Sequence, residues 1–202
     1  GFLTPSVNLF FFDTKISQST SLPYYFNISE DRELTFTPTI NYGGGIDSSQ
    51  RFNFDYNQII SGGYLSTNLT VDSTFENENS DKWLKEGSII NNLNTNLNEK
   101  FNLNITSALQ TSKDYIQQVN PNDELSYASS LTSSLEINGY NLNKIDDRLR
   151  LNISTYQINQ NNEDNKTTPT ILPFATYNTG SYELKNKVKY NNNYEFYNIF
   201  RD

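Results

Sequence analysis

The sequence predicts an all-β fold of antiparallel strands, with about eleven strands and essentially no helix. The first observation is composition, because only 35% of the 202 residues are hydrophobic, well below the roughly 45–50% of an ordinary globular domain. The second is that apolar and polar side chains alternate along most of the chain, which gives each strand one face of each kind. The third is that short and long connections alternate between these segments, as in a barrel that crosses a membrane.

The alternation predicts the strands in chain order. One example runs from residue 49 to residue 57, where Phe52, Phe54 and Tyr56 alternate with the polar residues Arg51, Asn53, Asp55 and Asn57. The apolar positions of successive strands are Leu34, Phe36, Pro38, Ile40 and Tyr42; Phe52, Phe54 and Tyr56; Leu65, Thr67, Leu69, Val71 and Phe75; Phe101, Leu103, Ile105 and Leu109; Leu131, Leu135 and Ile137; Leu149, Leu151 and Ile153; and Tyr182, Leu184, Val188 and Tyr190. No comparable segment repeats apolar residues at helical spacing.

Short and long connections separate these strands. Residues 29–32 form a tight polar turn, whereas the loops expected on the opposite side are longer and rich in Asn, Asp and Glu. These longer loops are Glu76 to Lys82, Thr111 to Glu124 and Asn159 to Pro169. The strands are long enough for the roughly 9–11 tilted residues that cross a bilayer. Because soluble sheets also alternate, the residues by themselves leave open a secreted β-sandwich or an adhesin-like array.

Charge and composition exclude several functions. The basic residues, 15 against 23 acidic ones, are scattered in a chain of net charge −8, so no nucleic-acid partner is expected. The chain has no Cys and no His, so we expect no enzyme, catalytic residue, metal site or cofactor, although no spacing singles out or excludes a glycosidase carboxylate pair. It also lacks the roughly 18–20 apolar residues of a membrane helix and a signal-peptide pattern, and is interpreted as a fragment or mature segment.

Prolines and aromatic residues near the N-terminus have alternative explanations. Pro5 fits the first residue of a strand, which is a common position for proline. Pro38 lies further inside a strand pattern and is expected to mark a bulge or a strand end. Tyr24, Tyr25 and Phe26 precede a short turn, and we expect them in the aromatic belt that anchors a barrel at the membrane interface. The alternative for these three is ordinary packing between sheets.

Several segments match one protein family in the order in which they occur. The most specific are residues 1–6 (GFLTPS), 22–29 (LPYYFNIS) and 31–38 (DRELTFTP). Looser matches follow at residues 81–83, 112–115, 139–140 and 168–173. Together they resemble the barrel of the lipopolysaccharide-assembly outer-membrane protein family, LptD or OstA. The resemblance implies that residues 1–202 are the N-terminal portion of the outer-membrane β-barrel domain, without the periplasmic jelly-roll and the remaining strands. It implies an open, curved sheet, because the family barrel needs many more strands.

The resemblance also implies transport across the outer membrane of a Gram-negative bacterium. In the family, the first and last barrel strands meet at a weak seam that opens sideways and releases lipopolysaccharide into the outer leaflet. Family prolines near the starts of the first two strands correspond to Pro5 and Pro23, which are therefore expected in the lateral gate. Proline has no backbone N–H, so each removes a possible hydrogen bond between strands, worth about 0.5–1.5 kcal/mol.

Partners follow from the same resemblance. The polar residues Arg51, Asn53 and Asp55 are expected to face the lumen and to solvate the sugar chain of lipopolysaccharide, while the apolar residues face the outer-membrane lipid bilayer. Family members hold an LptE-like plug lipoprotein in the lumen, and their periplasmic domain meets an LptA-like bridge protein. Both proteins are partners that the resemblance implies.

Overall fold

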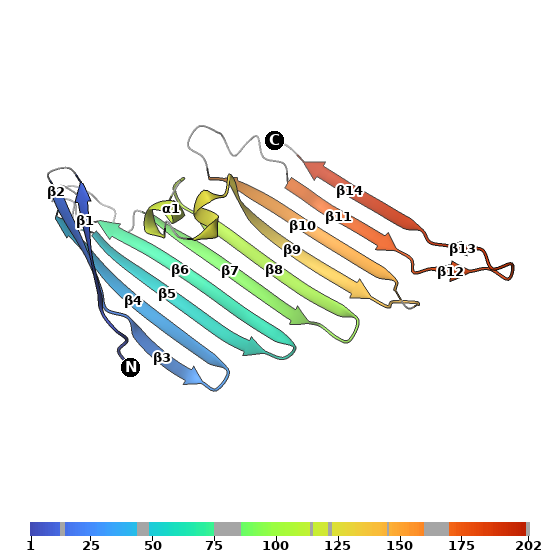
Figure 1. The fold of residues 1–202 in the computed structure, drawn as a ribbon, viewed down its shortest axis with the longest axis horizontal. Helices are drawn as coiled ribbons and strands as arrows, with labels where there is room; N and C mark the ends of the chain where they lie inside the picture. Colours follow the sequence, from blue (N-terminus) through green and yellow to red (C-terminus); the bar gives the residue numbers. More distant parts are fainter. Residues whose placement is uncertain are drawn as a thin grey trace. The chain divides into compact units, whose positions relative to one another are not determined.

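A computed structural model of the chain describes residues 1–12, 15–43, 49–74, 86–113, 115–120, 123–144, 146–159 and 170–200. Strands predominate (Figure 1). The elements in chain order are β1 (Ser6–Phe12), β2 (Lys15–Ser21), β3 (Tyr24–Ser29), β4 (Arg32–Gly43), β5 (Ser49–Ile60), β6 (Gly63–Thr74), β7 (Glu86–Asn96), β8 (Phe101–Gln110), α1 (Tyr115–Val119), the 3-10 helix η1 (Glu124–Tyr127), β9 (Ser130–Tyr140), β10 (Arg148–Ile158), β11 (Thr170–Asn178), β12 (Tyr182–Glu183), β13 (Lys189–Tyr190) and β14 (Asn193–Phe200).

Twelve of the strands form one antiparallel sheet. Its order is β1-β2-β4-β5-β6-β7-β8-β9-β10-β11-β14, and β3 pairs with β4 beside this path. Strands β12 and β13 form a separate two-stranded sheet. The larger sheet is open, because its order ends at β1 and β14 and no pairing joins these two strands within the described ranges. The prediction of an all-β, antiparallel fold is confirmed, and the strands are more numerous than expected because several short ones were not separated in the sequence.

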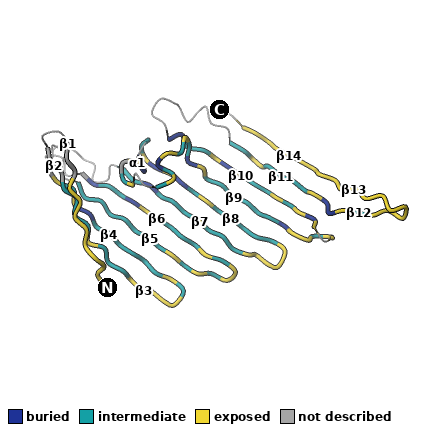
Figure 2. The backbone as a smooth tube through the Cα atoms, in the orientation of Figure 1, coloured by how far each residue is buried: buried dark blue, intermediate teal, exposed yellow. Residues whose placement is uncertain are grey.

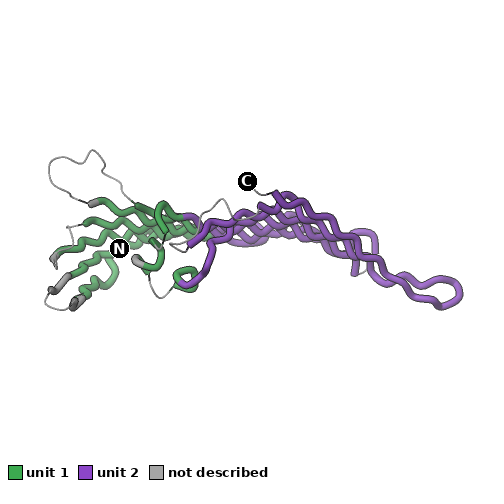
Figure 3. The backbone as a smooth tube through the Cα atoms, turned by 90° about the horizontal axis from the view of Figure 1, so that it is seen from above, with its two compact units in different colours: residues 1–59, 66–90, 110–126 green, residues 60–65, 91–109, 127–202 purple. Residues whose placement is uncertain are grey.

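Two compact units divide the chain (Figure 3). Unit 1 comprises residues 1–59, 66–90 and 110–126, and unit 2 comprises residues 60–65, 91–109 and 127–202. Strands β1 to β4 and helix α1 therefore belong to unit 1, whereas β9 to β14 belong to unit 2. The two units are described separately below.

Strand pairing brings side chains of like character onto the same face. In unit 1, Phe36 of β4 lies opposite Phe54 of β5, and Thr37 lies opposite Asn53. Because successive side chains of a strand point to opposite faces, these two pairs lie on different sides of the sheet. Apolar pairs in unit 2 are Leu103–Ile137, Ile105–Leu135 and Leu151–Ile137. Each unit therefore has one largely apolar and one largely polar face.

Few hydrophobic side chains are buried. Among the described residues they are Ala108, Tyr115, Ile116, Leu131 and Ile158. Figure 2 shows intermediate burial along most of the strands, and apolar strand residues such as Ile40 and Ile153 are 50% and 40% exposed. Within the described ranges the sheet is thus two-sided and encloses no large apolar core. No helix in that part of the chain is long and apolar enough to cross a membrane.

Short turns join strands at one end of the sheet. Ser61 and Gly62 connect β5 to β6, and Gly62 has a φ of 79°, which favours glycine. At the next residue, Gly63, an added Cβ would lie 1.8 Å from the carbonyl oxygen of Asn94. The expected alternation of short and long connections breaks at residues 179–192, because this connection on the short-turn side includes β12 and β13. The expected loops at Glu76 to Lys82 and Asn159 to Pro169 lie outside the described residues, apart from Asn159.

The loop expected at Thr111 to Glu124 contains most of the helical structure. Helix α1 has only five residues, which is too short for a helical repeat to appear in the sequence. It is held by packing and by one side chain, because Tyr115 and Ile116 are 1% and 3% exposed and the N–H of Ile116 donates to Oε1 of Gln110 at 3.0 Å. Among the residues that the structure describes, the expectation of essentially no helix therefore holds except for α1 and η1.

A buried carboxylate holds the loop between β9 and β10 against the end of β11. Asp147 is 0% exposed, and its Oδ1 accepts a hydrogen bond from the N–H of Gly180 at 2.7 Å. Its Oδ2 accepts bonds from the N–H groups of Asn143 and Lys144 at 3.3 and 3.1 Å and from the hydroxyl of Tyr177 at 3.1 Å. These donors, with Gly180 as the largest cause, hold the pKa of Asp147 below its ordinary value of 3.8.

Lowering the pH is expected to release this loop. Because the pKa of Asp147 is depressed in the folded chain, its stabilising contribution is fully present above the ordinary value of 3.8 and is lost as the pH falls through the lower folded-state value. The backbone amide NMR signal of Gly180 should therefore titrate with a midpoint below 3.8. Asp147→Asn should abolish the titration, and a wild-type midpoint at or above the ordinary value would contradict the arrangement.

Candidate functional site

The first residues of the chain pair with the start of β3. Residues 1–3 lie antiparallel to residues 23–25, and the N–H of Leu3 donates to the carbonyl oxygen of Pro23 at 2.9 Å. Such a pair normally exchanges two hydrogen bonds. The second cannot form here, because the nitrogen of Pro23 carries no hydrogen. The pair of Leu3 and Pro23 therefore has one hydrogen bond in place of two.

Pro5 lies where the same pairing changes register. Strand β1 pairs with β2 from Ser6 opposite Ser21 onward. Between the two stretches, Thr4 and Pro5 stand opposite the single residue Leu22, which is the two-against-one arrangement of a β-bulge. Pro5 directly precedes β1 and Pro23 directly precedes β3, so both lie at strand starts as the sequence predicted. Their role in a gate stays a prediction.

A third proline lies beside this interruption. Pro38 stands opposite Phe52 within an unshifted register between β4 and β5, so the expected bulge or strand end at Pro38 is wrong. The N–H of Leu22 donates to the carbonyl oxygen of Pro38 at 3.1 Å, and the reciprocal bond is missing for the same chemical reason. Strands β2 and β3 pair with the same edge of β4 in the same register. Leu22 and Pro23 lie between these two strands and separate them.

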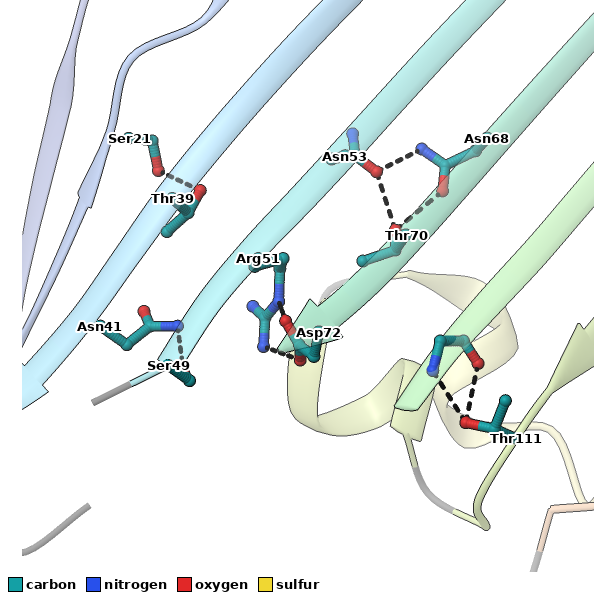
Figure 4. Close-up of polar contacts among 11 residues, drawn as sticks. Ser21, Thr39, Asn41, Ser49, Arg51, Asn53, Asn68, Thr70, Asp72 and Thr111 are labelled. Carbon is teal, nitrogen blue, oxygen red and sulfur yellow. Dashed lines mark hydrogen bonds and ion pairs between the residues drawn. The ribbon is translucent and has the colours of Figure 1, made fainter. Parts of the chain in front are cut away.

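The predicted polar residues lie together on one face of β5. Arg51 forms a bidentate ion pair with Asp72 of β6, in which Nε donates to Oδ1 at 2.9 Å and Nη2 donates to Oδ2 at 3.0 Å (Figure 4). Paired guanidinium and carboxylate groups of this geometry are among the stronger polar contacts in proteins. The carboxylate of Asp72 therefore balances the positive charge of Arg51.

Amide and hydroxyl groups continue this polar face. Thr70 donates from Oγ1 to Oδ1 of Asn53 at 2.8 Å, and Asn68 donates from Nδ2 to the same oxygen at 3.1 Å (Figure 4). Asp55 accepts hydrogen bonds from Asn53, at 2.6 Å, and from Asn68. Asn53 and Asp55 thus belong to one network, and Arg51 lies on the same face of the sheet in its own ion pair with Asp72. That this face lines a lumen stays a prediction.

Helix α1 covers part of this polar face. Tyr115 is 1% exposed and Thr70 is 4% exposed, whereas the side chains of Arg51 and Asp72 are 23% and 15% exposed. The hydroxyl of Tyr115 is buried without a hydrogen-bond partner in the described part of the chain. Burial raises the pKa of Tyr115, and the nearby carboxylate of Asp72 raises it further. The helix therefore partly screens the ion pair from solvent.

A second polar network occupies unit 2. Asn104 donates to Oδ1 of Asn102 at 2.8 Å, and Asn102 donates to Oδ1 of Asn94 at 3.4 Å, which gives a ladder of amides across β7 and β8. Further along the sheet, Nε of Arg150 donates to Oε2 of Glu136 at 2.6 Å. As in unit 1, an ion pair and a cluster of hydrogen-bonded amides occur on the sheet. The neutral amides can donate to and accept from hydroxyl groups.

The structure separates the three predicted interface aromatics. Tyr24 and Phe26 lie on the apolar face, with ring centroids 4.5 Å apart, and Tyr24 stands opposite Phe36. Tyr25 points to the polar face, where its hydroxyl donates to Oε2 of Glu33 at 2.8 Å. Alternation along β3 makes this division unavoidable. A membrane-interface belt stays a prediction for Tyr24, Tyr25 and Phe26, with Tyr25 on the polar side of the strand.

The sequence pattern did not assign three residues to the site. Asp72 was not matched to Arg51, because strand register cannot be read from one strand alone. Tyr115 lies in a segment expected to be a loop, and Pro38 was expected to mark a bulge or a strand end. No group of three or more Asp or Glu side chains is placed to hold a metal ion in the described ranges.

The fold and these networks define a class of protein: an open antiparallel sheet with one apolar and one polar face. No protein-family model matches the sequence. The chain is similar to the LPS-assembly protein LptD of Cupriavidus pinatubonensis, with 33% identity over 132 residues. This alignment takes in 58% of the chain and 15% of the relative, so the chain matches only a small part of that protein's length.

Proposed function

We propose that this chain is the N-terminal portion of an outer-membrane β-barrel domain that transports lipopolysaccharide and inserts it into the outer leaflet. The observation that carries the proposal is the similarity to an LPS-assembly protein. The two-sided sheet supports it, because an apolar strand face without a covering layer suits hydrocarbon. In this proposal residues 1–202 are continued by further strands, and a periplasmic jelly-roll precedes them.

Each face of the sheet then has a separate role. The apolar face, including Tyr24 and Phe26, meets the lipid bilayer of a Gram-negative outer membrane. The polar face, including Arg51, Asn53 and Asp55, lines the lumen and hydrogen-bonds to the sugar chain of lipopolysaccharide. Arg51 is already paired with Asp72, so the groups offered to a passing glycolipid are the amides of Asn53 and Asn68, the hydroxyl of Thr70 and the carboxylate of Asp55.

The weakened pairing of the first strand supplies the lateral gate. Pro23 lacks one hydrogen bond to Leu3, and Pro5 lies at the register shift before β1. Fewer hydrogen bonds lower the free energy needed to displace this strand. An LptE-like lipoprotein in the lumen and an LptA-like periplasmic bridge complete the proposed assembly. The role is transport and assembly rather than catalysis.

Photocrosslinking from adjacent residues of β5 tests the proposal. A photocrosslinking residue replaces Asn53, Asp55 or Phe54, one at a time, in the complete protein in cells. We expect crosslinks to lipopolysaccharide from positions 53 and 55, and crosslinks to phospholipid from position 54, because neighbouring residues of a strand face opposite ways. The matched positions control for expression and folding.

Two outcomes would reject the proposal. Absence of lipopolysaccharide from the products at both polar positions would remove the transport role. A protein that is soluble without detergent and crosslinks no lipid from position 54 would instead be a secreted β-sandwich or adhesin-like module, whose apolar faces pack together.

A further inference from the structure

A small hairpin interrupts the connection between β11 and β14. Tyr182 pairs with Tyr190 and Glu183 pairs with Lys189. The turn is closed by two further bonds, from the N–H of Leu184 to the carbonyl of Val188 at 2.8 Å and from the N–H of Lys187 to the carbonyl of Leu184 at 2.9 Å. Figure 1 shows β12 and β13 beyond the ends of β11 and β14. The turns β5–β6 and β7–β8 of the same unit are short and carry no such element.

One face of this hairpin is entirely apolar. Alternation places Leu184 on the same side as Tyr182, and Val188 on the same side as Tyr190. The two tyrosine rings stack with centroids 5.3 Å apart. Leu184 and Val188 are each 50% exposed and Tyr190 is 42% exposed, so these three side chains leave most of the face open to solvent.

The rest of the hairpin is basic, in contrast to the acidic chain. Residues 182–190 contain three lysines, Lys185, Lys187 and Lys189, against the single acid Glu183, whereas the whole chain has a net charge of −8. Lys189 and Glu183 approach to 4.0 Å with both side chains exposed, a contact that neutralises little. Lys144 adds another positive charge, with Nζ 3.8 Å from the centroid of the Tyr182 ring.

We infer that the β12–β13 hairpin docks on anionic lipid headgroups, with its apolar face in the membrane interface and its lysines on the phosphates. Tyrosine and aliphatic side chains partition into that interface, and lysines near it are attracted by anionic lipid. A folded protein is a poorer fit, because a stable protein interface needs roughly 20–30 residues a side and this apolar face has four. The inference rests on the proposed membrane location of the sheet.

Lipid quenching of a single tryptophan tests the inference in the full chain. The one native tryptophan is removed by Trp83→Phe, and Val188→Trp then reports on the hairpin in vesicles whose acyl chains are brominated. We expect stronger quenching in phosphatidylcholine mixed with phosphatidylglycerol than in phosphatidylcholine alone, and weaker quenching at high salt. Replacing all three hairpin lysines by glutamine should lower the partition constant by about a hundredfold, at about fivefold per lysine.

Two matched variants make each failure distinct. Glu183→Gln removes the acid of the same hairpin and should strengthen quenching, whereas the lysine variants weaken it. Phe54→Trp, in the same Trp83→Phe background, reports on the apolar face of β5. Quenching of Phe54→Trp without quenching of Val188→Trp overturns the hairpin inference and leaves the proposed function standing. Equal quenching of Val188→Trp in neutral and anionic vesicles also overturns it, and no quenching of either overturns both.

Discussion

Replacing Tyr115 by alanine is expected to release α1 from the sheet and to accelerate hydrogen exchange in the helix by at least about 100-fold. Truncating a buried aromatic side chain costs about 3–5 kcal/mol, and each 1.4 kcal/mol is a factor of ten. Tyr115 is 1% exposed, so it is a main anchor of a helix too short to form alone. The amides to follow are those of Ile116 and Asn120, which bond to Gln110 and to the carbonyl of Ile116.

Two further variants separate anchoring from other effects. Tyr115→Phe keeps the buried ring and removes only the hydroxyl, which makes no hydrogen bond in the described residues, so exchange should stay close to the wild-type rate. Tyr127→Ala truncates a tyrosine of the same connection that is 74% exposed and should change nothing in α1. Exchange in Tyr115→Ala at the wild-type rate would mean that the helix is held by something other than this ring.

The position of α1 also predicts a change in access to the polar face of the sheet. The helix lies over the polar face near the ion pair of Arg51 with Asp72, which is the surface proposed to meet lipopolysaccharide. Its release should make that face more accessible, so the crosslinking proposed from Asn53 should increase in Tyr115→Ala. The stability change and the crosslinking change then report on the same contact by independent means.

The strands were predictable because their physical cause is local. Every second residue from 52 to 56 is aromatic, and this alternation alone fixes that Arg51, Asn53 and Asp55 share a face. The opposite directions of Tyr24 and Tyr25 follow from the same rule. Local pattern therefore accounts for the fold class and for which residues share a face.

The partners across the sheet were not predictable, because they depend on register. The pairing of Arg51 with Asp72 requires the length of the β5–β6 turn to be known. Pro38 could not be placed from its own strand, since its missing donor matters only beside Leu22. Helix α1 owes its existence to the burial of Tyr115, a tertiary effect without a sequence signature.

In the complete protein, replacing both Pro5 and Pro23 by alanine is expected to slow lipopolysaccharide export. The new N–H at position 23 completes the hydrogen-bonded pair with Leu3, and alanine at position 5 adds a donor and frees φ at the register shift. The bond added at position 23 contributes about 0.5–1.5 kcal/mol, which lowers the open population about 2- to 12-fold. The measurement is the rate at which new lipopolysaccharide reaches the cell surface, at equal amounts of the protein in the outer membrane.

Pro38→Ala is the matched control, because it makes the same chemical change in a different pairing. Its new N–H points from β4 to Leu22, which lies between β2 and β3. The pairing of Leu3 and of β1 is untouched. Export should then stay close to the wild-type rate. If Pro38→Ala slowed export as much as the double variant, general stiffening of the sheet would explain the result better than a gate at the first strand. If the double variant exported at the wild-type rate, Pro5 and Pro23 would have no part in opening the seam.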